Sequence, residues 1–289
     1  MSSDNSLEKV KKLRETTGVG FKDCKIALDE NNGDIEKSIE FLRKKGIAKA
    51  NKKMQRVAAD GLVCIYEKEN MFSMIEINSE TDFVAKNEIF INFAEQLSEI
   101  AFQKKGNIDN IMKSEMKNKK TVKDSLVDLI SKIGEKITLR RAIFIDSEKK
   151  INFSYTHTAI KKNIGKLGVV LSLETNKQKK DVEDLGKKLS MHIAASSPIS
   201  LDKEDLDQNI LSKEKEIITE ELKNSGKDPK IIDKIAMGKL NKFINDNSLL
   251  NQEWIMDPKM KVKDVIKENS GKDKIVIKNF FRFKVGEGI

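Results

Sequence analysis

The spacing of apolar residues changes at Val57, and this change constrains the fold more than any other feature of the sequence. Before it, apolar residues recur every three or four positions, as they do on one face of a helix. After it, two mostly apolar runs within 61–78 are joined by a polar turn, which predicts a β-hairpin. Helical spacing returns from about Asn87 and from Val122, and 137–145 is typical of a strand. The order strand, strand, helix, helix, strand predicts an α+β fold with helices packed on an antiparallel sheet.

The first 56 residues are predicted to form three short helices. The first is expected to end near Gly18 and Gly20, since glycine allows the turn, and Asp34 is suited to cap the third. Short helices around a glycine-bounded turn resemble a ubiquitin-associated (UBA-like) bundle, although a generic three-helix module fits the pattern equally well. The basic segment 44–56 that follows is expected to be a polar helix or a linker.

The second half of the chain repeats the pattern of strands and helices predicted for the first. Strands are predicted over 153–158 and 166–174, and a helix over 181–195. The segment that begins at Val262 loosely repeats the segment that begins at Val122, so a duplicated core of two α+β halves is the simplest interpretation. The predicted units are a helical domain with its linker over 1–56, a first core half over 57–146 and a second core half over 147–289.

An insertion of about 203–247 separates the matched ends of the second half. Two highly charged helical stretches flank the turn 225–229, where Asp228 can cap the return helix and Pro229 can begin it. This pattern predicts an antiparallel helical hairpin, or coiled coil. Its apolar stripe is too narrow to form a core, so we expect the hairpin to project and to serve as a contact arm.

The charge of the chain favours nucleic-acid binding only at first sight. Basic residues exceed acidic ones, 55 to 46, which gives a formal net charge of +9. However, the excess is spread along the chain and only six of the 55 basic residues are arginine. Phosphate-reading surfaces usually concentrate arginine and stacking aromatic residues. Nucleic acid is therefore not the expected partner, and a basic RNA- or ribosome-associated module is kept as the alternative function.

Residues that carry catalytic or metal chemistry are scarce. The two histidines, His157 and His192, are isolated, and His192 lies in an apolar helical stretch that suggests a position in the core or on the helix surface and not a catalytic role. The two cysteines, Cys24 and Cys64, lack metal-ligand spacing, and no phosphate-binding glycine motif is present. We therefore predict no enzyme activity, no metal, no cofactor and no direct binding of nucleotide.

The sequence also indicates the cellular location of the protein. No apolar run reaches the roughly 18 residues that a membrane span requires, and the first residues do not have the build of a signal or transit peptide. Two cysteines without disulfide-like spacing suit a reducing compartment. These observations predict a soluble cytoplasmic protein that does not bind membranes.

One segment, 79–87, has two interpretations. It follows the strand predicted at 74–78, and Thr81 or Asp82 can cap the next helix while Phe83 packs into the core. Alternatively, Asp82 and Phe83 form an exposed pair, an acid beside an aromatic ring, which is suited to inserting into a partner. The residues alone leave both interpretations open.

Several motifs, in order along nearly the whole chain, resemble the elongation factor Ts family. The most specific is Thr-Asp-Phe-Val-Ala-Lys at 81–86, and Leu-Arg-Glu-Thr-Thr-Gly-Val-Gly at 13–20 resembles the N-terminal signature of the family. The other matching segments are 23–25, 27–28, 32–36, 42–46, 58–61, 133–135, 191–195 and 285–288.

The resemblance implies a guanine-nucleotide exchange factor whose partner is elongation factor Tu, in its GDP-bound and nucleotide-free forms. The bundle and the first core half are then expected to contact the GTPase domain of the partner, and the second half and hairpin other parts of it. The implied site that displaces magnesium and GDP comprises Thr81, Asp82, Phe83 and Val84. The implied contacts of the N-terminal domain are Arg14, Gly18, Phe21 and Lys22; family members often carry two methionines where this chain has Phe21 and Lys22.

Overall fold

The computed structural model describes residues 3–17, 19–224 and 229–289. Gly18 and Asp228, to which the sequence assigned a contact and a cap, lie outside the described residues. The N-terminal helices pack around Leu13, Cys24 and Leu42, all of which are buried. The Asp34 carboxylate accepts a hydrogen bond from the Lys37 N–H group at 3.0 Å, as predicted for a cap. These helices are α1 (Ser3–Thr17), α2 (Phe21–Glu30) and α3 (Ile35–Lys53).

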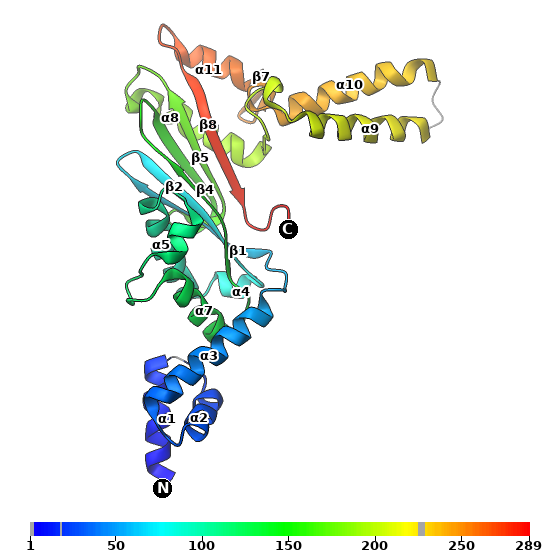
Figure 1. Cartoon of the computed structure of the whole chain (residues 1–289). Coiled ribbons are helices and arrows are strands. Elements are labelled where there is room, and N and C mark those ends of the chain that lie inside the picture. The colour runs from blue at the N-terminus through cyan, green and yellow to red at the C-terminus, as the bar shows by residue number, and fades with distance from the viewer. Residues whose placement is uncertain (1–2, 18, 225–228) are drawn as a thin grey trace.

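Helix α3 extends beyond the apolar positions on which its prediction was based, and it connects the bundle to the core (Figure 1). It runs to Lys53, so most of the basic segment 44–56 is helix and not linker. It packs against a helix of the first core half, where a Cβ atom at Gly46 would lie 2.7 Å from the Ser131 hydroxyl. Arg43 also forms an ion pair with Asp124, at 3.2 Å. The bundle is therefore in direct contact with the core.

The first half of the core has the predicted order of strands and helices. Strand β2 lies between β1 and β3, and both pairings are antiparallel. The helix predicted from Val122 ends at Gly134, whose φ of 91° requires the left-handed region that glycine tolerates. The short helices α4 and α6 were not predicted. The elements are β1 (Asp60–Lys68), β2 (Met71–Ser79), α4 (Asp82–Ala85), α5 (Glu88–Gln103), α6 (Ile108–Lys113), α7 (Val122–Ile133) and β3 (Thr138–Ile145).

The second half has a corresponding arrangement. A hairpin of β4 and β5 is longer than predicted, and the last strand, β8, pairs with β5. The two similar sequence segments each fold into a helix followed by a strand at the border of the sheet, α7–β3 in one half and α11–β8 in the other. The elements are β4 (Ile151–Lys161), β5 (Ile164–Glu174), α8 (Lys179–Ser196), α11 (Val262–Ser270) and β8 (Val276–Lys284).

The two halves share one sheet and an apolar cluster. The strand order is β3-β2-β1-β5-β4, with β8 also bonded to β5. Strand β1 meets β5 over a short register, in which Cys64 lies opposite Ile164. Beyond it the strands of the halves pack face to face, since a Cβ atom at Gly168 would lie 2.7 Å from Val63 and 2.9 Å from Met74. Helices α5 and α7 cover one outer face and α8 and α11 the other.

The insertion forms two helices that project from the second half (Figure 1). Helices α9 (Gln208–Asn224) and α10 (Pro229–Asn247) pack along Ile218, Leu222, Ile232 and Ala236. At their base His192 is buried and stacks on Trp254, with ring centroids 5.1 Å apart, so of the two positions expected for this histidine, core or helix surface, it occupies the core. The remaining elements are η1 (Lys203–Asp205), η2 (Leu249–Asn251), β6 (Glu253–Trp254) and β7 (Asp257–Lys261). In the described part of the chain, no helix is both long and apolar enough to cross a bilayer.

Candidate functional site

The segment 79–87 connects β2 to α5 and places an acid and an aromatic ring on the surface. Phe83 is 79 % exposed, so the interpretation that packed it into the core is wrong. The Asp82 side chain is 45 % exposed, whereas Val84 is buried beneath the turn. Thr81 has extended backbone angles and directly precedes α4, but its side chain does not cap this helix. The segment therefore presents Asp82 and Phe83 outward over a buried anchor.

Two glutamates fix the backbone of this turn. The Glu135 carboxylate accepts hydrogen bonds from the N–H groups of Glu80 and Thr81, at 3.1 and 3.0 Å, and from the Thr81 hydroxyl at 2.7 Å. In return, the Glu80 carboxylate accepts the N–H group of Lys136 at 2.6 Å and pairs with Arg56 at 3.3 Å. Charge-assisted hydrogen bonds in both directions hold the two loops together. Glu135 was part of a family motif in the sequence, but its role was not predicted.

The Asp82 carboxylate of the exposed pair is influenced by two lysines, Lys86 and Lys166. Lys86 donates to Asp82 at 2.7 Å, and this hydrogen bond is the main cause that holds the pKa of Asp82 below its ordinary value. The charge of Lys166, from the second half, acts on the Asp82 pKa in the same direction. The Lys166 ammonium group also contacts the Asp60 carboxylate. Asp82 is therefore an anion paired directly with Lys86.

The predicted contacts in the N-terminal bundle lie on its surface. Arg14, Phe21 and Lys22 are exposed, and the exposed fraction of Phe21 is 43 %. The residues before Gly18 also line a cleft of about 670 Å³, in which Thr16 and Thr17 face side chains of α5 and α7. The structure thus brings the end of α1 close to α5, the helix that follows the Asp82–Phe83 turn. The members of α5 that line the cleft are Ile89, Phe93 and Gln96.

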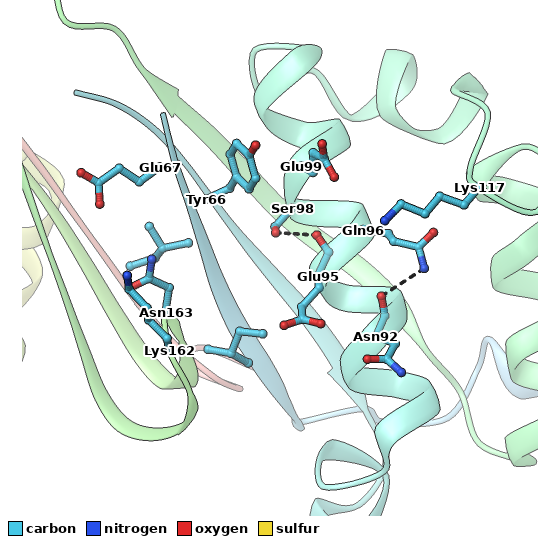
Figure 2. Close-up of a pocket in the computed structure, with 12 residues that line it drawn as sticks. Tyr66, Glu67, Asn92, Glu95, Gln96, Ser98, Glu99, Lys117, Lys162 and Asn163 are labelled. Atoms are coloured by element: carbon cyan, nitrogen blue, oxygen red, sulfur yellow. Dashed lines mark hydrogen bonds between the residues drawn. The ribbon is translucent and has the colours of Figure 1, made fainter. Parts of the chain in front are cut away.

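A second hollow, of about 540 Å³, lies beside the first along α5 and shares Gln96 and Lys117 with it (Figure 2). Glu95 and Glu99 project from the helix, and Lys117 and Lys162 approach from neighbouring segments (Figure 2). Glu95 is paired with Lys161 at 2.8 Å. The lining mixes both signs of charge, and its Ser98 hydroxyl donates to the Glu95 backbone carbonyl at 2.8 Å. Within residues 3–17, 19–224 and 229–289, no three His, Cys, Asp or Glu side chains form a group that can hold a metal ion.

The histidines and cysteines lie apart from the exposed pair or take part in packing. His157 is exposed, and its Nδ1 atom lies 2.9 Å from the Tyr155 hydroxyl. His192 is buried at the hairpin base, and this burial lowers its pKa. Cys24 and Cys64 are both free thiols in the interior, and burial raises the pKa of each.

Comparison with known proteins relates the chain to one family along most of its length. A family model described as Elongation factor TS matches residues 80–287, which include the Asp82–Phe83 turn. The protein Elongation factor Ts of Caulobacter vibrioides is 40 % identical over 286 residues, covering 97 % of this chain and 92 % of the relative. The protein of the same name from Bartonella quintana is 40 % identical over 283 residues, with the same two coverages. That of Gluconobacter oxydans is 39 % identical over 280 residues, covering 97 % of this chain and 91 % of the relative.

Proposed function

The chain belongs to the elongation factor Ts family, and from this premise we propose that it is the nucleotide-exchange factor of elongation factor Tu. It binds the GDP-bound GTPase in the cytoplasm, promotes the release of GDP and allows GTP to bind in its place. The observation that carries this proposal is the exposed Asp82–Phe83 pair on a turn fixed by Glu135. This chain supplies binding energy and no covalent or proton-transfer step.

The Asp82–Phe83 turn is proposed to act on the magnesium and phosphate region of the partner. Phe83 supplies apolar area that fills a gap in the GTPase, and Asp82 supplies a charge that competes for the polar groups around the magnesium ion. Because the turn is already rigid, little conformational entropy is lost when it inserts. Thr81 and Val84 belong to the same site as supports, through the bond of Thr81 to Glu135 and the burial of Val84.

Thermodynamic linkage explains how binding alone accelerates release. A protein that binds the nucleotide-free GTPase more tightly than the GDP-bound form must lower the affinity for GDP by the same factor. A difference of about 4 kcal/mol between the two forms would correspond to a thousandfold change in affinity. When GTP is abundant it refills the vacated site and the exchange factor dissociates.

The other parts of the chain are proposed to extend the contact. The bundle, which we take to be UBA-like, contacts the GTPase domain through Arg14, Gly18, Phe21 and Lys22. The hairpin, as a coiled-coil arm, and the second half of a duplicated core reach other parts of the partner. The exposure of Arg14, Phe21 and Lys22 and the projection of α9 and α10 support this division (Figure 1).

A fluorescent GDP analogue bound to elongation factor Tu provides the test. Addition of the wild-type chain with excess unlabelled nucleotide should accelerate loss of the fluorescent analogue, in a manner that saturates with the concentration of the chain. A folded chain that leaves the release rate unchanged with a matched partner would overturn the proposal.

The alternative, a basic RNA-binding module, predicts a different result in the same preparation. Binding to RNA would weaken steeply with salt, because phosphate contacts release counterions, and would not depend on Phe83. A salt titration of RNA binding by the wild-type chain and Phe83→Ala therefore separates the two functions.

A further inference from the structure

Among the described residues, the two most exposed large apolar side chains lie at one end of the β1–β2 hairpin. They are Phe83 and Val57, which is 72 % exposed. The next two, Ile217 and Met237, belong to the projecting helices α9 and α10. A single exposed apolar side chain is common on protein surfaces and needs no explanation. Two of them that the fold holds at one place do need one, and Val57 has no part in the site described so far.

The strand register places Val57 and Phe83 at the same end of the sheet. Asp60 lies opposite Ser79 as the first pair of the β1–β2 ladder. The chain enters this ladder from Val57, shortly before Asp60, and leaves it toward Phe83, shortly after Ser79. Figure 1 shows the segment that joins α3 to β1 beside α4, the helix that carries Phe83.

Charge-assisted hydrogen bonds hold these two segments together directly. The Arg56 guanidinium group donates to both oxygens of the Glu80 carboxylate, at 3.3 and 3.4 Å. Lys136 joins the segments a second time, because its N–H group donates to Glu80 at 2.6 Å and its ammonium group donates to the Arg56 carbonyl at 2.8 Å. That carbonyl belongs to the peptide bond between Arg56 and Val57. We call these bonds the Arg56–Glu80–Lys136 clamp.

The segment that carries Val57 has a defined conformation on both sides of it. The Arg56 N–H group donates to the Lys53 carbonyl at 2.9 Å, which closes a turn after α3. Ala58 is buried and anchors the segment before β1 begins. Val57 therefore faces the solvent from an ordered backbone, and little conformational entropy is lost when a partner covers it.

We propose that Val57 is a further contact residue for the GTPase partner, and that the Arg56–Glu80–Lys136 clamp positions it beside the Asp82–Phe83 turn. The matching surface of the partner is an apolar one, next to the gap that receives Phe83. This inference rests on the proposed exchange function, from which it takes the partner. It adds a residue of the linker to the interface, outside both the turn and the contacts proposed for the bundle.

A fluorescent label tests the contact directly. Both native cysteines are buried, so Val57→Cys can be labelled selectively with an environment-sensitive dye. Ile108→Cys is the matched control, because Ile108 is an exposed apolar residue of α6 that takes no part in the clamp. Nucleotide-free elongation factor Tu should shift the emission of the label at position 57 to shorter wavelength and protect it from a soluble quencher. The label at position 108 should not change.

The outcomes of this experiment are distinct because formation of the complex is followed separately, by size-exclusion chromatography. A complex that forms without a change at position 57 would overturn the proposal and leave the exchange function standing. A change that grows with the concentration of the labelled chain alone would show that a second copy covers Val57, and it would also overturn the proposal. If the wild-type chain itself forms no complex, the exchange function fails and the proposal fails with it.

Two substitutions measure what Val57 contributes to affinity. Because the side chain is so exposed, neither Val57→Ala nor Val57→Asp should move the urea midpoint of unfolding. Val57→Ala should weaken binding to nucleotide-free elongation factor Tu roughly three- to tenfold, since two methyl groups leave the interface. Val57→Asp should weaken it roughly 30-fold or more, because a charge loses its water on binding. Ile108→Ala should bind as the wild type does, and wild-type affinity of both Val57 variants would contradict the proposal.

A double-mutant cycle tests the positioning role of the clamp. Arg56→Met removes the bonds to Glu80 and keeps most of the side-chain length. If the clamp positions Val57, then Val57→Ala should weaken binding less in the Arg56→Met protein than in the wild type, by roughly two- to threefold. Losses that simply multiply would show that Arg56 only stabilises the fold, and they would overturn its positioning role.

Discussion

Glu135 and Thr81 lie 54 residues apart in the sequence, and the carboxylate of one accepts two hydrogen bonds from the other. The bonds are 3.0 Å long to the backbone N–H group and 2.7 Å to the hydroxyl. A loop that follows α7 thereby fixes the loop that carries Asp82 and Phe83. The conformation of the turn that carries the exposed pair is therefore stabilised by this tertiary contact and not by local interactions alone.

Replacement of Glu135 by alanine is expected to loosen the turn. Two backbone donors and one hydroxyl lose their acceptor, so the free energy of unfolding should fall by about 1–3 kcal/mol. GDP release should slow as well, because the turn must then be ordered on binding. Urea denaturation and the release assay measure the two effects, and Thr81→Val, which removes only the hydroxyl donor, should show a smaller loss of each. Unchanged stability of Glu135→Ala would contradict the role given to this carboxylate.

Phe83→Ala is expected to separate function from stability. Because the ring is 79 % exposed, the free energy of unfolding should change by no more than about 0.5 kcal/mol. The acceleration of GDP release should fall by roughly 30-fold or more, as for an aromatic residue that contributes at least about 2 kcal/mol to an interface. Asp82→Ala should show the same pattern.

The neighbouring Val84→Ala is the control for the Phe83 prediction. Val84 is buried, so its truncation should lower the stability by about 1–3 kcal/mol. At a temperature where this variant is folded, it should retain more exchange activity than Phe83→Ala. A Phe83→Ala protein with full activity would show that the exposed ring is not used.

Glu76, on β2, is completely buried and accepts hydrogen bonds from Arg141 at 2.6 Å and from Arg140 at 3.1 Å. Glu76→Gln is therefore expected to change how stability depends on pH. The folded-state pKa of Glu76 is lowered, so its contribution to stability is present above the unfolded value of about 4.3 and is lost as the pH falls below it. The variant should be less stable than the wild type at pH 7, by about 2–4 kcal/mol, because a buried charge network is broken. The difference should shrink as the pH approaches 3. Parallel stability curves from pH 7 to pH 3 would show that Glu76 is not the titrating group.

The burial of His192 predicts a second effect of pH on stability, at a higher pH than that of Glu76. Its Nδ1 atom accepts the N–H group of Ile255 at 3.4 Å, so Nε2 carries the proton and donates to Gln252 at 2.9 Å. Burial lowers the folded-state pKa, against the smaller effect of the Gln252 hydrogen bond. The unfolded chain therefore binds the extra proton first, and stability should fall with decreasing pH from about 6.5.

The test for His192 compares the only two histidines of the chain. His192→Gln should flatten the stability curve between pH 7 and pH 5, whereas His157→Gln, which changes an exposed side chain, should keep the slope of the wild type. Equal slopes in all three proteins would contradict the account of the hairpin base.

Local sequence patterns predicted the elements well because they record which face of each element is buried. The helix from Val122 and its stop at Gly134 follow from apolar spacing and from one glycine, and both are found. The exposure of Phe83 did not follow, since an aromatic residue after a cap fits a buried position equally well. The bonds of Glu135 could not be predicted from residue spacing, because they join residues that only the folded sheet brings together. The short junction between β1 and β5 has no local signal either.

The central claim is that the Asp82–Phe83 turn favours the nucleotide-free partner, and a comparison of affinities tests it most directly. The dissociation constant of the chain would be measured for elongation factor Tu without nucleotide and with GDP, using wild type and Phe83→Ala. The account predicts that wild type binds the nucleotide-free form far more tightly, that GDP affinity falls by the same factor in its presence, and that Phe83→Ala loses most of this difference. Equal affinities of the wild-type chain for the two forms would contradict it.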